Sequence, residues 1–196
     1  MSHVAFVGHP NAGKSTLFNA LTGAAAHVGN YPGITVSRYA APLELGPGRS
    51  VTAVDLPGTY SLAARSPDER IAIDEIVGHR TEPPDLVVAV VDTPRLLRSL
   101  YLVLQVLELQ VPVVVALNLW DEVERSGRAP SAQAVSEALG GVPCIPVSGR
   151  TGKGVAELRQ AIAAALDTPI VHGSPQALGD TLRADGAEVA AALPTS

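Results

Sequence analysis

Apolar residues recur in two different patterns along the chain. Short, nearly uninterrupted apolar runs, such as 86–91 and 111–117, are rich in β-branched residues. Runs of this kind are typical of strands that other elements cover on both faces. The predicted strands are 4–7, 52–54, 86–91, 111–117 and 144–147, with a further strand expected within 35–45.

Between these runs, apolar residues recur at helical spacing. Leu96 and Leu100, for example, fall on one face of a helix. The predicted helices are 17–23, 94–109 and 155–166. We expect Thr93 to cap the second helix, with Pro94 in its first position. Strands that alternate with helices predict an α/β fold with a doubly wound, mostly parallel sheet flanked by helices, whose ligands bind at the carboxyl ends of the strands.

The pattern weakens towards the end of the chain. Residues 1–167 carry the alternation, whereas 168–196 contain one amphipathic helical pattern with little to pack against. We interpret 1–167 as one domain and 168–196 as the truncated start of a second, helical unit or a flexible tail. The 196 residues are enough to bury a core without disulfides or a structural metal.

Composition narrows the classes of function. The formal net charge of -5 argues against a nucleic-acid partner, which would favour a basic field. The single cysteine, Cys144, excludes an internal disulfide and fits a reducing compartment. The histidines show no metal-ligand spacing, and no apolar run reaches the roughly 18 residues of a membrane span. We therefore expect no direct membrane insertion of this chain, and we see no signal peptide.

The first predicted strand leads into the sequence GHPNAGKS, residues 8–15. It matches the pattern G-x-x-x-x-G-K-[ST] and opens a predicted helix, which is the context that this phosphate-binding motif requires. Its glycines let backbone N–H groups surround phosphate oxygens, and the helix N-terminus adds a positive dipole. Lys14 is expected to reach the β- and γ-phosphates, and the Ser15 hydroxyl to bind Mg²⁺.

A second motif, DLPG at 55–58, follows the strand predicted at 52–54. An aspartate at a strand end can hold Mg²⁺ through water, so Asp55 is a candidate for this role. Gly58 allows a backbone N–H to approach the γ-phosphate. The pattern D-x-x-G also occurs in ordinary turns, and its position at a strand end favours the functional interpretation.

Two further loops predict recognition of the base. Asp121, in NLWD at 118–121, can accept hydrogen bonds from guanine N1–H and N2–H₂, a donor pair that adenine lacks. Asn118 is expected to tie this loop to the phosphate loop. Residues 148–150 are expected to offer backbone N–H groups to guanine O6. The alternatives are a helix cap for Asp121 and an ordinary turn for 148–150.

With these motifs in order, the chain resembles the GTPase domain of the bacterial ferrous iron transporter FeoB family over about residues 3–166. The segments that carry the resemblance are GHPNAGKSTLFNALTG, VGNYPGITVSR, VDLPGTYSL, SPDERIAIDEI, LYLVLQVLELQVPVVVALN and PVSGRTGKGV. The resemblance implies a Ras-like P-loop NTPase fold and Mg²⁺-dependent hydrolysis of GTP to GDP and phosphate. It also implies a cytoplasmic switch domain that precedes the membrane transporter segment of the same parent protein, in the bacterial inner membrane.

Two positions depart from the family's usual pattern. Leu119 stands where the base loop usually has Met, and Gly149 stands where the last loop usually has Ala. Gly149 keeps its N–H but adds conformational freedom, so we expect an effect on guanine affinity or release.

The resemblance also implies how the γ-phosphate is sensed and cleaved. Thr35 is the first-switch threonine, which closes on Mg²⁺ and the γ-phosphate. Thr59 stands where Ras-like proteins place a water-orienting Gln, so intrinsic hydrolysis should be slow or assisted differently. In related potassium-activated GTPases an Asn at the position of Asn11 holds K⁺, with backbone carbonyls here near Gly29 and Tyr31. The K⁺ then supplies the charge of an arginine finger. A loop-stabilising role is the alternative for Asn11.

The resulting site prediction has three parts. The catalytic group is Asn11, Lys14, Thr35 and Gly58, and the Mg²⁺ ligands are Ser15, Thr35 and Asp55. The nucleotide-binding residues are Gly8, His9, Pro10, Asn11, Ala12, Gly13, Lys14, Ser15, Thr16, Gly33, Ile34, Thr35, Asp55, Leu56, Pro57, Gly58, Asn118, Leu119, Asp121, Ser148, Gly149 and Arg150.

Two other functions stay open at this point. One is a nucleotide-binding regulatory module that turns over slowly and needs an activating partner. The other is an RNA-linked assembly GTPase, against which the net charge of -5 argues. Weak self-association is compatible with each of these functions.

Overall fold

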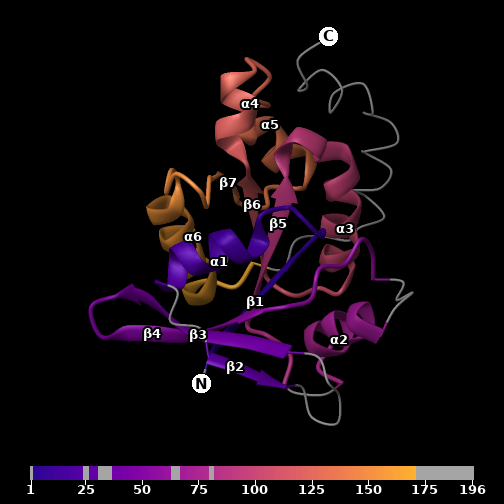
Figure 1. The fold of residues 1–196 in the computed structure, drawn as a ribbon, viewed down its shortest axis with the longest axis vertical. Coiled ribbons are helices and arrows are strands. Elements are labelled where there is room, and N and C mark those ends of the chain that lie inside the picture. The colour runs from indigo at the N-terminus through magenta and orange to yellow at the C-terminus, as the bar shows by residue number, and fades with distance from the viewer. Residues whose placement is uncertain (1, 24–26, 31–36, 63–66, 80–81, 171–196) are drawn as a thin grey trace.

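One twisted sheet of seven strands, in the order β2-β3-β4-β1-β5-β6-β7, forms the centre of the molecule (Figure 1). This computed structural model describes residues 2–23, 27–30, 37–62, 67–79 and 82–170. The strands are β1 (His3–Gly8), β2 (His27–Asn30), β3 (Ser37–Gly46), β4 (Arg49–Asp55), β5 (Leu86–Asp92), β6 (Val113–Asn118) and β7 (Cys144–Pro146). The α-helices are α1 (Lys14–Thr22), α2 (Pro67–Ile76), α3 (Leu96–Glu108), α4 (Trp120–Arg125), α5 (Ala132–Ala138) and α6 (Val155–Asp167), and a 3₁₀ turn η1 (Thr93–Arg95) precedes α3.

The strand directions place the candidate loops at one edge. β1 pairs in parallel with β4 and β5, and β6 continues the parallel order from β5 to β7. The carboxyl ends of these strands therefore lie at one edge of the sheet, where the loops that follow Gly8, Asp55 and Asn118 all begin. β3 runs antiparallel to β4, and β2 antiparallel to β3, so a hairpin extends the sheet on one side. The prediction of a doubly wound, mostly parallel sheet is confirmed.

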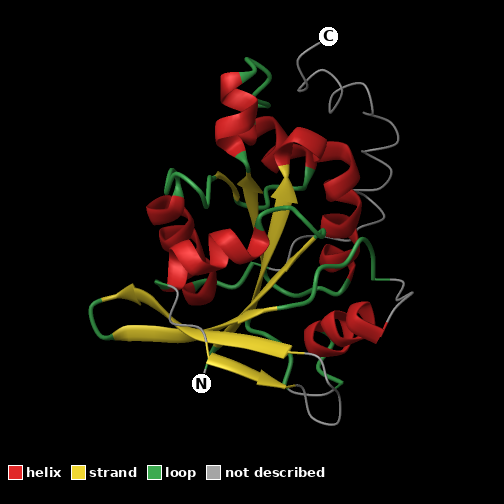
Figure 2. Ribbon diagram, viewed as in Figure 1, coloured by secondary structure: helices red, strands yellow, loops and turns green. Residues whose placement is uncertain are grey.

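Helices cover both faces of the sheet (Figure 2). Leu17 and Phe18 of α1 pack with Leu158 and Ile162 of α6 against one face. Residues of α2, α3, α4 and α5 pack against the other. All seven residues of β5 are buried, as its continuous apolar run predicts for a strand covered on both sides.

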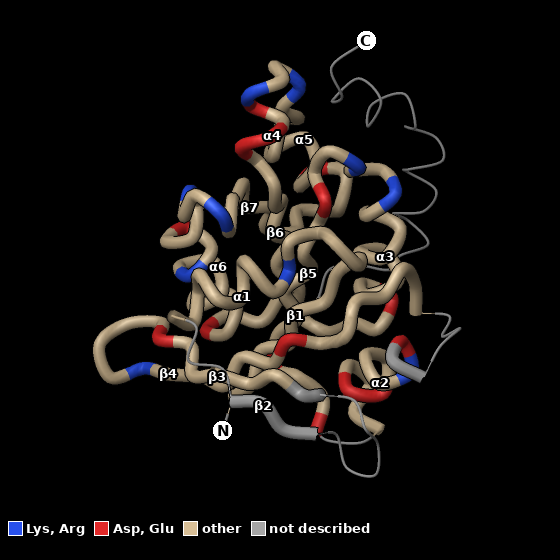
Figure 3. Tube along the Cα trace, in the orientation of Figure 1, with Lys and Arg blue, Asp and Glu red and all other residues tan. Residues whose placement is uncertain are grey.

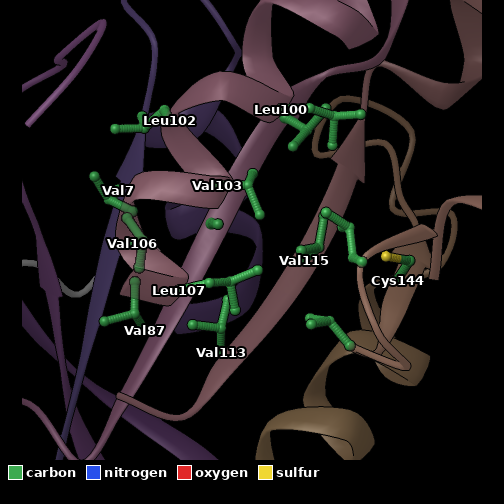
Figure 4. Close-up of a cluster of buried hydrophobic side chains, with 14 of the residues drawn as sticks. Val7, Val87, Leu100, Leu102, Val103, Val106, Leu107, Val113, Val115 and Cys144 are labelled. Atoms are coloured by element: carbon green, nitrogen blue, oxygen red, sulfur yellow. The ribbon is translucent and has the colours of Figure 1, made fainter. Parts of the chain in front are cut away.

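The larger hydrophobic cluster is mostly aliphatic, with Trp120 as an aromatic member. Figure 4 shows Val103, Val106 and Leu107 of α3 beside Val87 and neighbouring strand residues. Cys144 lies at the margin of this cluster and is buried. Burial raises the pKa of its thiol to about 12.

The start of α3 differs from the prediction. Residues 93–95 form the 3₁₀ turn, and the α-helix begins only at Leu96. Thr93 is 3% exposed, and within the described structure its hydroxyl has no hydrogen-bond partner, so it does not cap the helix. The expectation of a Thr93 cap is therefore wrong. The buried position of Thr93 follows from its place at the end of a strand that is covered on both faces.

The pattern also missed several short elements. Helices α2, α4 and α5 and strand β2 were not among the predicted elements, since each is short or only weakly periodic. Strand β6 begins at Val113 instead of residue 111, and the carbonyl of Pro112 accepts the N–H of Val87 from the neighbouring strand. Residues 171–196, where the start of a second unit was expected, lie outside the described residues.

Charged positions are spread over the trace instead of gathering on one element (Figure 3). Among the described residues, no helix combines the length and hydropathy that crossing a membrane would take.

Candidate functional site

The phosphate loop between β1 and α1 has the backbone that its glycines predict. Gly13 has a φ of 73°, and Asn11 also adopts a left-handed conformation with a φ of 67°. A Cβ atom at Gly13 would lie 2.6 Å from the Nδ2 of Asn118, and one at Gly8 would lie 2.6 Å from the carbonyl oxygen of Val90. Both glycines are therefore required by close approach of neighbouring strands and loops.

This loop borders a cavity of about 340 Å³ at the carboxyl edge of the sheet. The lining residues are His9, Pro10, Asn11, Gly13, Lys14, Ser15, Thr16 and Gly58. Gly13 occupies the N-cap position of α1, and no side chain caps the helix there. The first-turn N–H groups of α1 are thus oriented for an anion, as expected for phosphate.

Lys14 and Ser15, which line the cavity, converge on Asp55. The ammonium of Lys14 forms an ion pair with Oδ1 of Asp55, and both side chains are nearly buried. The hydroxyl of Ser15 donates to Oδ2 of the same carboxylate over 2.8 Å. A hydroxyl beside a carboxylate is a donor set that suits Mg²⁺, so these residues fit the metal that the motif implies.

Asn118 ties three loops together. Its amide Nδ2 donates to the carbonyl of Ala12 over 2.8 Å, and its Oδ1 accepts the N–H of Gly149 over 3.1 Å. Asn118 is 1% exposed, so both hydrogen bonds lie inside the protein. The predicted tie between the base loop and the phosphate loop is confirmed, and it extends to the loop after β7.

Gly149 packs closely against α1. A Cβ atom there would lie 2.7 Å from the backbone N and Cα of Leu17. The close approach of α1 therefore leaves no room for a side chain at this position. Its N–H already donates to Asn118, so donation to guanine O6 stays a prediction.

Asp121 presents an ionised carboxylate in the first turn of α4. Its side chain is 13% exposed and accepts hydrogen bonds from Arg150 and, over 3.3 Å, from Arg125, both at Oδ2. The hydrogen bond from Arg150, and then one from Ser148, holds the pKa of Asp121 below its ordinary value. The N-cap position of α4 belongs to Leu119, with no side-chain cap, so the structure does not support the helix-cap interpretation of Asp121.

Thr59 turns away from the cavity. It is 0% exposed, its hydroxyl donates to the carbonyl of Ser61 over 2.6 Å, and its N–H donates to the carbonyl of Gly8 over 3.1 Å. The side chain of Thr59 thus makes its hydrogen bond within its own loop. This placement agrees with the expectation that Thr59 does not orient an attacking water.

A stack of three side chains next to the phosphate loop escaped the sequence analysis. The imidazole of His9 lies against the ring of Tyr60, and the Arg98 guanidinium of α3 lies 4.7 Å from the centre of that ring. The N–H of Leu62 donates to Oε1 of Gln105 on α3 over 2.8 Å. Burial, and then the charge of Arg98, lowers the pKa of His9. No local motif links residues so far apart in sequence, so only the fold could reveal this contact.

Seven further predicted residues fall into three groups. Ala12 and Leu56 are buried in the core, although the carbonyl of Ala12 serves the site through Asn118. Gly29 lies in β2, which β3 and β4 separate from β1 in the sheet. Tyr31, Gly33, Ile34 and Thr35 lie outside the described residues, so the first switch and the carbonyl of Tyr31 stay predictions.

Comparison with known proteins agrees with the resemblance noted from the sequence. The family model described as ferrous iron transport protein B matches residues 2–162. A Porphyromonas gingivalis Fe(2+) transport protein A/Fe(2+) transporter FeoB fusion protein is 46% identical over 155 residues, which are 79% of this chain and 18% of that protein. The chain thus spans about a fifth of the length of the curated relatives that it matches, or 20% in the Shigella flexneri Fe(2+) transporter FeoB.

Solved structures agree with the fold. The cytosolic domain of L. pneumophila FeoB has a TM-score of 0.76 and 38% identity, over 83% of this chain and 68% of that chain. The cytosolic domain of the T. maritima FeoB iron transporter in its GMPPNP form has a TM-score of 0.81 and 36% identity, over 88% and 67%. These structures share the P-loop GTPase fold described above. With the family match over most of its length, this chain belongs to the ferrous iron transport protein B family, in which it corresponds to the N-terminal G domain.

Proposed function

We propose that the chain binds GTP with Mg²⁺ and hydrolyses it to GDP and phosphate, with stimulation by K⁺. We further propose that it does so as the cytoplasmic switch domain of a ferrous iron membrane transporter. The observation that carries the proposal is the convergence of Lys14 and Ser15 on Asp55, at the edge of the sheet where Asp121 also lies. One edge thus offers groups for phosphate, metal and base.

Backbone N–H groups and the charge of Lys14 bind the phosphates. The N–H groups at the start of α1 surround phosphate oxygens, and Lys14 exchanges its partner Asp55 for the β- and γ-phosphates. The exchange leaves Asp55 and Ser15 as oxygen donors for the metal. Bound Mg²⁺ would supply charge that offsets the charge on the phosphate oxygens.

The guanine base is recognised through hydrogen bonds of fixed direction. Asp121 is ionised and therefore only accepts, which matches the N1–H and N2–H₂ donors of guanine. Asn118 holds this loop at a set distance from the phosphate loop through its bond to Ala12. Adenine would leave the carboxylate without its donors, and sites of this kind discriminate strongly against such an analogue.

Hydrolysis needs positive charge at the γ-phosphate beyond that of Lys14. The eight residues that line the cavity include no arginine. Thr59 is turned inward and offers no side chain to the attacking water. An added monovalent cation near Asn11 would supply the missing charge, which is the reason for proposing K⁺ stimulation.

The test is GTP hydrolysis at fixed Mg²⁺ in KCl and in NaCl at equal ionic strength, for the wild type and Asn11→Ala. Asn19→Ala, an exposed change on α1, is the matched control. Strong stimulation by K⁺ that is lost only with Asn11→Ala would support the proposal. Equal, very slow turnover in both salts would favour the second candidate, a GTP-binding regulatory module, which the inward position of Thr59 keeps open.

The link to iron transport needs the parent protein. We expect Asp121→Asn in the full-length transporter to reduce ferrous iron uptake by cells, and unchanged uptake would contradict the switch role.

A further inference from the structure

The side chain of Arg150 bonds the carboxylate that is expected to read the base. Its Nη2 donates to Oδ2 of Asp121, where Nη2 of Arg125 also donates over 3.3 Å. Asp121 and Arg150 differ in how far their side chains can move, because that of Asp121 is 13% exposed and that of Arg150 is 62% exposed. The carboxylate is thus held in place by α4, whereas the guanidinium can swing into water.

Guanine and the arginine side chain present closely related hydrogen-bond donors to a carboxylate. The N1–C2–N2 edge of guanine is itself a planar guanidine unit with N–H donors on one side. The arginine guanidinium presents the same kind of planar fork to a carboxylate. Since Asp121 must accept two hydrogen bonds from the base, a guanidinium on Oδ2 occupies one of the positions that guanine requires.

We propose that Arg150 acts as an internal competitor of guanine for Asp121 and thereby weakens nucleotide binding and speeds nucleotide exchange. The inference rests on the proposed function, because it places guanine at Asp121. The arginine leaves the carboxylate when the base enters, and it returns to the carboxylate when the base departs.

The size of the effect follows from the exposure of Arg150. An ion pair with one exposed partner changes an equilibrium constant by roughly 1.4- to 5-fold. Removing the competitor should therefore tighten guanine binding by up to about fivefold. The gain should shrink at high salt, which screens the competing pair.

Lys153 provides a matched control for charge. It lies in the same loop region, its side chain is 52% exposed, and it pairs with Glu124 instead of Asp121. Its removal takes away one positive charge without freeing the base-reading carboxylate. General electrostatics predict that losing a cation weakens the binding of an anionic nucleotide.

The experiment measures the affinity and dissociation rate of GDP with a fluorescent ribose label, at low and high salt, for the wild type, Arg150→Ala and Lys153→Ala. We expect Arg150→Ala to bind up to about fivefold more tightly and to release GDP more slowly, with a smaller gain at high salt. Lys153→Ala should bind no more tightly than the wild type. Thermal unfolding without nucleotide checks that each variant is folded.

Weaker GDP binding by folded Arg150→Ala would overturn the inference, because Arg150 would then assist the nucleotide. Unchanged binding would overturn it as well. Neither result contradicts the proposed function, which is tested separately: by whether the wild type binds GDP in preference to ADP, and by the hydrolysis and iron-uptake experiments described above.

Discussion

The imidazole of His9 lies against the ring of Tyr60, with the ring centres 5.1 Å apart and the planes tilted by 54°. His9 belongs to the phosphate loop, and Tyr60 follows the DLPG motif by two positions. Arg98 closes the stack from α3. The segment that begins at Gly58 is thus held between the phosphate loop and a helix, and it is positioned beside the cavity by an aromatic side chain.

Replacing Tyr60 tests this stack. Tyr60→Ala removes both the ring contact and the cation–π contact, which are worth about 0.5–1.5 and 0.5–1 kcal/mol at partly exposed sites. We expect GTP turnover to fall several-fold with little change in KM, because Gly58 loses its support. Tyr60→Phe keeps the ring and should behave like the wild type. Equal turnover for the Ala and Phe variants, measured as initial rates, would contradict a positioning role.

The lowered pKa of His9 predicts a pH dependence of stability. Burial and Arg98 lower the pKa, while a backbone hydrogen bond with Tyr60 and the charge of Asp92 oppose the shift. An unfolded histidine titrates near pH 6.5, so below about 6.5 the unfolded chain binds more protons than the folded one. The free energy of unfolding should therefore be retained above about pH 6.5 and fall as the pH drops towards the lowered folded-state pKa.

Urea unfolding between about pH 8 and 5.5 measures this slope. The slope should be smaller in His9→Gln. His79→Gln is the control, since the side chain of His79 is 73% exposed. An unchanged slope in His9→Gln would show that other groups cause the dependence.

Asn118→Ala should destabilise the fold as well as the site. The change leaves the carbonyl of Ala12 and the N–H of Gly149 without their buried partner. Unsatisfied buried groups cost about 1–3 kcal/mol each, so for these two groups we expect a loss of about 2–6 kcal/mol in the free energy of unfolding. Denaturant unfolding without nucleotide separates this loss from weaker binding, and a loss below about 0.5 kcal/mol would mean that the loops do not depend on this link.

Gly149→Ala should be unfavourable here, although alanine is the residue that the family pattern usually carries. The new Cβ atom would meet the backbone of Leu17 at 2.7 Å. Overpacking of this kind costs about 1–3 kcal/mol, and we expect the loop after β7 to shift and GDP affinity to change with it. Gly46→Ala is the matched control, because nothing lies within 4 Å of its Cβ position. Thermal unfolding and GDP binding of both variants check the prediction, and equal stability would contradict it.

Asp121→Asn should redirect base specificity. The amide accepts one hydrogen bond and donates another, so it matches the N1–H and C2 carbonyl of xanthine better than guanine. We expect GDP binding to weaken by at least about 100-fold and XDP to bind more tightly than GDP. Competition assays with both nucleotides test the prediction. Retained preference for GDP would remove Asp121 from base recognition.

Sequence predicted the parts of the site that lie in contiguous motifs. The phosphate loop, Asp55 and the Asn118 tie were predictable because each sits directly after a strand, where the sheet brings loops together. The stack of His9, Tyr60 and Arg98 was not predictable, since it joins three distant loops and helices through side-chain packing. The Thr93 cap failed for a similar reason, because burial at the end of β5 overrode a local capping preference.

The same distinction applies to Gly149 and Arg150. Residue type suggested conformational freedom for Gly149, and the fold adds that α1 approaches it too closely for a side chain. The backbone N–H of Arg150 was predicted to face guanine O6, whereas the contact of its side chain with Asp121 was visible only in the fold.

The buried thiol of Cys144 has a practical consequence for spectroscopy. It is the single cysteine of the chain, and with a pKa of about 12 only a very small fraction is thiolate at neutral pH. Alkylating probes should therefore react little with Cys144 and should instead label a cysteine introduced at an exposed position such as Tyr101 on α3. Distance measurements between a dye there and a labelled nucleotide would then report nucleotide binding and release in real time, with the native cysteine left in place.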